Sequence, residues 1–138
     1  MAKNLREAYK EVFKAMYADA LEISDEANAT RAAAKKALDN EREKLARLEE
    51  KAEECRGNFV NQGRLLKASA RSNQPLELLK EISDNIQLFV SSKEEIPDVE
   101  EEIAKKGQDL SVCESDFIRA VNDVEAIRRF LTAEEAEE

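Results

Sequence analysis

Two cysteines and a dense run of carboxylates are the side chains that could carry chemistry here, because the sequence contains no histidine. A Ser-His-Asp triad and a histidine zinc site are therefore excluded, and two cysteines cannot complete a zinc tetrahedron. The sequence has no glycine-rich phosphate loop and no nucleophile elbow. We expect a chain that is not an enzyme and that has no catalytic residue, metal ligand or cofactor.

The acidic run lies in "EEIPDVEEE", where six carboxylates fall between Glu94 and Glu102. A metal site needs converging ligands, usually at fixed spacing and with histidine or a calcium-loop signature. These acids are contiguous and have neither feature. We interpret the run as a solvated face or a mobile loop.

The cysteines are expected to be free thiols. Cys55 falls on a helical apolar repeat, where it acts as a small apolar residue. Cys113 lies near an expected helix start, which can lower the pKa of a thiol, but Glu114 and Asp116 oppose that effect. Without a secretory signal or an apolar run of about 18 residues, the chain is predicted to be cytoplasmic.

Composition predicts one all-α domain. The 138 residues include 3 Gly and 2 Pro, and 38% are charged, which is typical of long helices. The first 70 residues carry 14 Lys/Arg and 13 Asp/Glu, whereas residues 71–138 carry 8 and 18, so charges of +1 and −10 make up the net −9. This acidic second half disfavours binding to nucleic acid or to an anionic membrane.

A single helix is predicted from about residue 3 to residue 70, as a dimerisation segment spanning 1–70. Its apolar residues follow the alternating steps of three and four of a coiled-coil seam, with one extra step of four, a stutter, between Glu41 and Leu45. The predicted seam comprises Leu5, Tyr9, Val12, Met16, Ile23, Ala27, Thr30, Ala34, Ala37, Leu45, Leu48, Ala52, Cys55, Phe59, Gln62, Leu66 and Ser69. Such a rod, roughly 100 Å long, is unstable alone and needs other helices to cover its seam.

Residues 71–133 are predicted to fold back on the rod as shorter helices. Ser72, Asn73 and Gln74 form a loop, and Pro75 opens an amphipathic helix of about four turns ending near Phe89. A further turn is expected between Pro97 and Gly107, and a capping box of Ser111 with Glu114 is expected to start the last helix. Residues 134–138 are expected to form an acidic disordered tail.

The order of these pieces resembles the coiled coil and COS box of the tripartite-motif (TRIM) family, in its midline and muscle-RING-like subgroup, and the related fibronectin/SPRY coiled-coil proteins. The resemblance covers about residues 5–133 and runs through "ECRGNFVNQGRLLKAS", "PLELLKEISDNIQLF" and "SDFIRAVNDVEAIRRFLTAEE". The two COS triplets of the family fall on Leu78-Leu79-Lys80 and Arg128-Arg129-Phe130. Leu79 keeps the central leucine and Phe130 the aromatic, whereas Arg128 and Arg129 depart from the pattern.

The resemblance implies an elongated antiparallel homodimer through the first helix, association with microtubules and a cytoskeletal location. It makes the two triplets the candidate partner-binding residues. The net charge of −10 over residues 71–138 opposes binding to acidic tubulin. Two alternatives stay open: a purely structural coiled-coil spacer, and a monomeric three-helix bundle, against which the short second half argues because it could cover only part of the rod.

Overall fold

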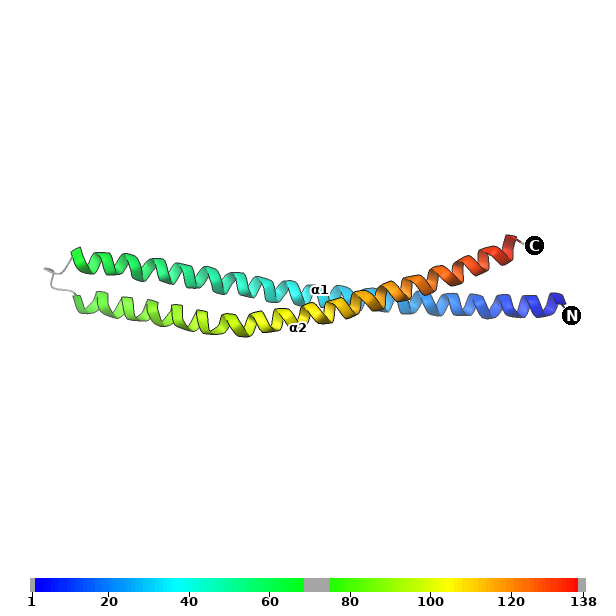
Figure 1. Cartoon of the computed structure of the whole chain (residues 1–138), viewed down its shortest axis with the longest axis horizontal. Coiled ribbons are helices and arrows are strands. Elements are labelled where there is room, and N and C mark those ends of the chain that lie inside the picture. The colour runs from blue at the N-terminus through cyan, green and yellow to red at the C-terminus, as the bar shows by residue number, and fades with distance from the viewer. Residues whose placement is uncertain (1, 69–74, 137–138) are drawn as a thin grey trace. The chain divides into compact units, whose positions relative to one another are not determined.

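The computed structural model describes residues 2–68 and 75–136 of the chain, with side chains over 6–67 and 76–133, and all of these residues are helical. Helix α1 spans Ala2–Ala68 and helix α2 spans Pro75–Ala136 (Figure 1). The two helices pack against each other. The all-α prediction is confirmed, and both ends of α1 lie within two residues of the predicted positions, about 3 and 70. Pro75 is the first residue of α2, as predicted, and the loop formers Ser72, Asn73 and Gln74 lie outside the described residues.

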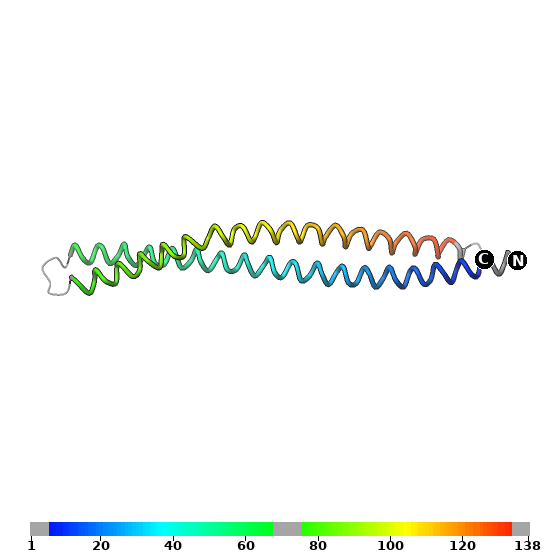
Figure 2. Tube along the Cα trace, turned by 90° about the horizontal axis from the view of Figure 1, so that it is seen from below, coloured from blue at the N-terminus to red at the C-terminus, as the bar shows by residue number. Residues whose placement is uncertain are grey.

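The second half differs from the prediction, because α2 is one helix of 62 residues rather than several short ones. Pro97 lies inside the helix, Gly107 does not end it, and Ser111 is an interior residue and not an N-cap. The acidic run from Glu94 to Glu102 is helical with its six carboxylate residues exposed, so it is the solvated face of the two interpretations and not a loop. Helix α2 also extends to Ala136, into the segment expected to be a disordered tail, whose last two residues lie outside the described ranges. Figure 2 shows the coloured trace of α2 as one unbroken helix.

Helix α2 continues past its breakers because its covered positions keep the alternating three-four spacing through this region. These positions are Leu78, Ile82, Asn85, Phe89, Ser92, Ile96, Val99, Ile103, Lys106, Leu110, Cys113, Phe117, Ala120, Val124, Ile127 and Leu131. Pro97 is exposed, so water can solvate the carbonyl that its missing N–H leaves without a helical partner. Packing along the whole seam outweighs the local cost of the proline and the glycine.

The helices divide into two compact units, the first built from residues 1–37 and 106–138. In this unit α1 and α2 run antiparallel, since Phe13 contacts Phe130 at 4.2 Å between ring centroids, and Arg31 lies 4.4 Å from the centroid of Phe117. Its buried centre is made of small side chains, Ala20 and Ala120. The helix backbones can approach closely there, and little apolar volume fills the seam at that point.

The second unit comprises Leu38–Lys105 and is also an antiparallel helix pair. Its buried side chains are Leu38, Ala52, Cys55, Val99 and Ser92. The hydroxyl of Ser92 donates to the carbonyl of Leu88 on its own helix at 2.8 Å, so the buried polar group is satisfied.

A polar pair sets the register of the second unit. Asn85 donates its side-chain N–H to the Oε1 of Gln62 at 2.8 Å, and Gln62 donates to Glu81 at 3.3 Å. One helical turn away, Phe59 and Phe89 meet edge to face at 5.5 Å. A shift of the helices would bury the amides without these partners, so the contact favours a single alignment.

The similar lengths of the helices overturn the argument against a monomer that rested on a short second half. Helix α2 has 62 residues against 67 in α1, so the chain has enough helix to cover its own seam. The expected stutter is also wrong for the covered seam of α1. That seam keeps the regular spacing over residues 10, 13, 17, 20, 24, 27, 31, 34, 38, 41 and 45. The extra step arose because the predicted seam followed a neighbouring apolar stripe in the first half of α1.

Gly107→Ala should stabilise the protein. Gly107 is helical, has no positive φ, and a Cβ placed there meets nothing within 4 Å. Removing the backbone freedom of glycine should therefore raise the free energy of unfolding by about 0.5–1 kcal/mol, measured by urea denaturation followed by circular dichroism. The reverse change at the exposed helical residue Ala104, Ala104→Gly, should lower it by a similar amount. A destabilised Gly107→Ala variant would show that the continuous helix is wrong at this point.

Candidate functional site

The described residues hold no candidate metal site. Over 2–68 and 75–136 no group of three or more His, Cys, Asp or Glu side chains could hold a metal ion. Within the same ranges, neither helix has a stretch apolar enough to cross a bilayer. Cys55 is buried and Cys113 is half-buried, and both are free thiols. The surfaces that remain as candidates are apolar ones.

The predicted dimer seam divides into a covered part and an exposed part. Ten of its residues are buried or half-buried in the described structure: Ala27, Ala34, Ala37, Leu45, Leu48, Ala52, Cys55, Phe59, Gln62 and Leu66. Ser69 lies outside the described residues. The other large residues stay exposed: Tyr9, Val12, Met16 and Ile23. The side chain of Leu5 lies outside the described residues. Much of the surface expected to need a second copy thus lies on the face of α1 that α2 covers.

Heptad letters describe the exposed part. If the covered positions of each helix are a and d, Tyr9, Met16 and Ile23 occupy g positions of α1 and Val12 a c position. In an antiparallel pair the g positions of both helices lie along the same side of the seam. We call this side of the first unit, with its g and c positions, the groove face. Helix α1 therefore has two adjacent apolar stripes here, of which α2 covers one.

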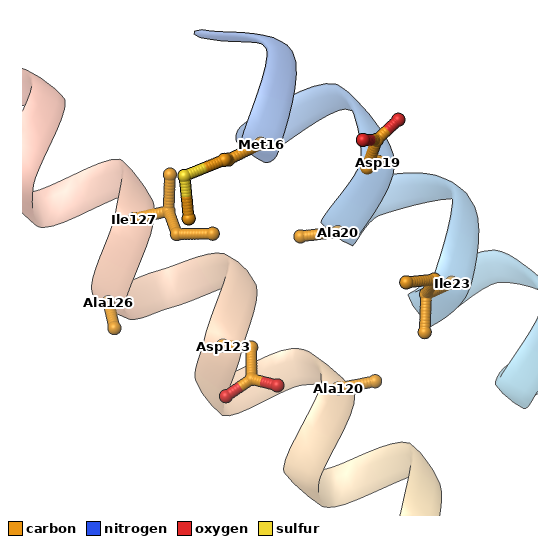
Figure 3. A pocket seen from close by; sticks show the side chains of 8 residues that line it. All are labelled: Met16, Asp19, Ala20, Ile23, Ala120, Asp123, Ala126 and Ile127. Carbon is orange, nitrogen blue, oxygen red and sulfur yellow. The ribbon is translucent and has the colours of Figure 1, made fainter. Parts of the chain in front are cut away.

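A hollow of about 440 Å³ lies on the groove face between the two helices. It is lined by Met16, Asp19, Ala20 and Ile23 of α1 and by Ala120, Asp123, Ala126 and Ile127 of α2. Figure 3 shows the side chains of Met16 and Ile127 pointing toward each other from opposite helices at one end of it. The alanines create the hollow, because their methyl groups leave the space between the helices unfilled.

The second unit has an exposed apolar stripe of its own, on α2. It consists of Leu76, Leu79, Ile86 and Val90, spaced at three, seven and four residues, and Val60 of α1 lies on the same side by register. We call these five residues the α2 stripe. Their e and b positions are distinct from the g and c positions of the groove face.

The residues of the COS triplets are placed differently from one another. Leu78 is half-buried in the seam, whereas Leu79 and Lys80 are exposed. Phe130 is 43% exposed and packs on Phe13. Arg128 and Arg129 both bind one carboxylate oxygen of Glu125, at 2.9 Å and 3.3 Å. The structure thus leaves Leu79 as an uncovered apolar residue and pairs both arginines within their own helix.

The arginine pair changes the acidity of Glu125. The hydrogen bond from Arg128 is the main cause that holds the pKa of the Glu125 carboxyl below its usual value, and Arg129 adds a smaller effect. The same contact raises the pKa of Arg128. Arg128 and Arg129 are exposed and Glu125 is half-buried at the surface, so this is a local surface contact and not a buried functional centre.

Sequence reasoning missed the α2 side of the groove face. Ala120, Ala126 and Ile127 were not singled out as a binding surface, because short helices with uncertain starts gave no common register. The signal was present in the continuous three-four spacing of α2. Tyr9, Val12, Met16 and Ile23 were predicted, as part of the dimer seam.

No protein-family model, curated protein or solved structure matches this chain.

Arg128→Gln should raise the pKa of Glu125 toward its ordinary value, because the first cause of the depression is the hydrogen bond from Arg128. Any stabilisation from this pair is present above the usual pKa of glutamate and is lost as pH falls through the lowered value. The side-chain carboxyl carbon of Glu125, followed by NMR during a pH titration, measures the shift. Arg129→Gln should have the smaller effect, and the opposite order would contradict the geometry.

Proposed function

We propose that this chain is a non-enzymatic protein-interaction scaffold that self-associates as a homodimer through the α2 stripe. The observation that supports the proposal is the stripe itself. Leu76, Leu79, Ile86 and Val90 remain exposed after the two helices of the second unit have covered their seam. Aligned large apolar residues on an otherwise highly charged helix favour contact with another helix.

The α2 stripe fits a second copy of itself. Antiparallel contact of two α2 helices, with the two-fold axis near Ser83, would pair Leu76 with Val90 and Leu79 with Ile86 of the second copy. In that alignment Lys80 faces Gln87, so no like charges meet beside the apolar contacts. The contact is isologous, the commonest arrangement in soluble dimers.

The energies predict a dimer that depends on concentration. Burying the exposed half of each stripe side chain contributes about 1 kcal/mol, so the ten side chains of two copies contribute about 10 kcal/mol. Loss of translational and rotational freedom costs about 4–15 kcal/mol. These terms are similar in size, so dilution should dissociate the dimer.

The proposed contact lies on α2 rather than on the first helix. Most of the α1 seam that was predicted to form the dimer faces α2 in the same chain. A second copy could reach it only if α1 and α2 separated. The proposal keeps the antiparallel homodimer and changes the surface that forms it.

Association with microtubules, which the TRIM resemblance implies, stays a prediction. Arg128 and Arg129 share Glu125, which reduces the positive charge that they can offer to an acidic surface. Co-sedimentation with polymerised tubulin tests it directly. A purely structural spacer role would instead leave both exposed stripes without a ligand.

Leu79→Glu combined with Ile86→Glu should abolish the dimer, because two carboxylates from each copy, four in all, would then have to be buried in the contact. Light scattering should give wild type a mass near twice 15.6 kDa at tens of micromolar and the variant a mass near 15.6 kDa. Leu88→Glu is the matched control, since Leu88 is as exposed as Ile86, 45% against 42%, but lies at a g position away from the stripe. A wild-type monomer at all concentrations, or equal loss in the control, would end the proposal.

A further inference from the structure

We infer that the groove face of the first unit binds a basic amphipathic helix of a partner protein. The inference rests on the scaffold role proposed above but not on the dimer, because the groove face and the α2 stripe belong to different units. Three features support it: uncovered apolar side chains, a hollow between two helices, and the charge around both.

The apolar part has the dimensions of a helix-binding groove. Tyr9 and Ile23 mark its ends along α1, 14 residues apart, which is roughly 21 Å or four helical turns. Val12 and Met16 lie between them and are exposed as well. A third helix laid along this face can place apolar residues at i, i+3, i+4 and i+7 against the row, as amphipathic helices do in other grooves.

The hollow supplies a place for a large anchor side chain. Ala20 and Ala120 form its floor as the two buried residues of the unit, and Met16, Ile23 and Ile127 form apolar walls. About 440 Å³ is enough for a leucine or an aromatic ring entering from above. Such a residue would cover the thinnest part of the seam, where the helices bring only methyl groups together.

The charge on the groove face selects the partner. Over the described residues its g and c positions carry five acids and one base: Asp19, Glu26, Asp109, Asp116 and Asp123 with Arg119. Asp19 projects from α1 and Asp123 from α2 at the hollow (Figure 3), and neither forms an ion pair within the described residues. Lysine or arginine flanking the apolar stripe of a partner helix would meet these carboxylates at the rim.

A second copy of this chain is the weaker occupant by the same reasoning. Two groove faces brought together would juxtapose five acids with five acids, and like charges across an interface cost affinity. The α2 stripe has no such excess beside its apolar residues. Each exposed stripe therefore favours a different partner, a copy of itself at the second unit and a basic helix at the first.

The test uses the full chain and three synthetic 18-residue peptides. The first carries leucines on one helical face and Lys/Arg elsewhere, the second has the same composition with its leucines dispersed, and the third has Glu in place of every base. Fluorescence anisotropy at physiological salt should show binding of the first peptide alone. Equal binding of the dispersed basic peptide would reduce the effect to the net charge of the chain and overturn the inference, and so would the absence of binding by the first peptide.

Two variants locate the binding. Ile23→Glu should weaken binding of the first peptide by about tenfold or more, because it puts a charge at an anchor position. Ile118→Glu should change it less than about twofold, since Ile118 matches Ile23 in type and in exposure, 59% against 58%, but lies on the opposite side of the same unit. Circular dichroism should show equal helicity in both variants. Equal weakening by both would overturn the inference.

Two further measurements separate electrostatics and self-association. Asp19→Asn with Asp123→Asn should reduce the salt dependence of peptide binding, whereas Glu7→Gln with Glu114→Gln, at e positions away from the groove face, should leave it unchanged. Light scattering of Ile23→Glu should give the wild-type mass. A fall to the monomer mass in that variant would show that a second copy occupies the groove face, and it would overturn the inference while leaving a dimer of different geometry.

Discussion

The structure depends on one constraint, which is that two long helices of similar length must keep the same alternating three-four spacing along their covered faces. Helices of more than 60 residues with 38% charged residues in the chain cannot be held by local propensity alone. Packing along the seam supplies the missing stabilisation. It also explains why Pro97 and Gly107 are tolerated inside α2, since each interrupts one turn while the covered positions on both sides stay in register.

The two units meet this constraint with different side chains. The second unit buries leucine, valine and cysteine and adds the Gln62–Asn85 hydrogen bond, which favours one alignment. The first unit buries little besides Ala20 and Ala120, so its larger apolar residues at the neighbouring g and c positions are left uncovered. The thin zone of the seam and the exposed stripe therefore occur together: beside Ala20, the bulky residues Met16 and Ile23 lie next to the seam rather than in it.

Much of this fold could be predicted from the sequence, and the errors have physical causes. Helix α1 and the start of α2 at Pro75 follow from apolar spacing and from the preference of proline for a first turn. The prediction of several short helices in place of α2 was wrong because Pro97, Gly107 and Ser111 were given more weight than the apolar spacing that continues through them. At the candidate surfaces, Tyr9 to Ile23 and Leu79 could be found, but Ala120, Asp123 and Ile127 could not, since their position opposite α1 depends on the correct register of α2.

The remaining difficulty is that apolar spacing shows which residues must be covered and not which chain covers them. Burial of apolar surface is non-directional, so the same stripe is stabilised by its own chain, by a copy or by another protein. Whether the chain can cover its own stripe depends on helix length, and a 62-residue α2 is long enough to cover α1. The charge beside the stripe decides between a copy of the chain and another protein. Carboxylates at the rim of the groove face repel a copy and attract basic side chains, whereas the α2 stripe meets its copy without like-charge contacts. Physical arguments about a partner therefore rest on the polar residues that flank the stripe more than on the apolar residues within it.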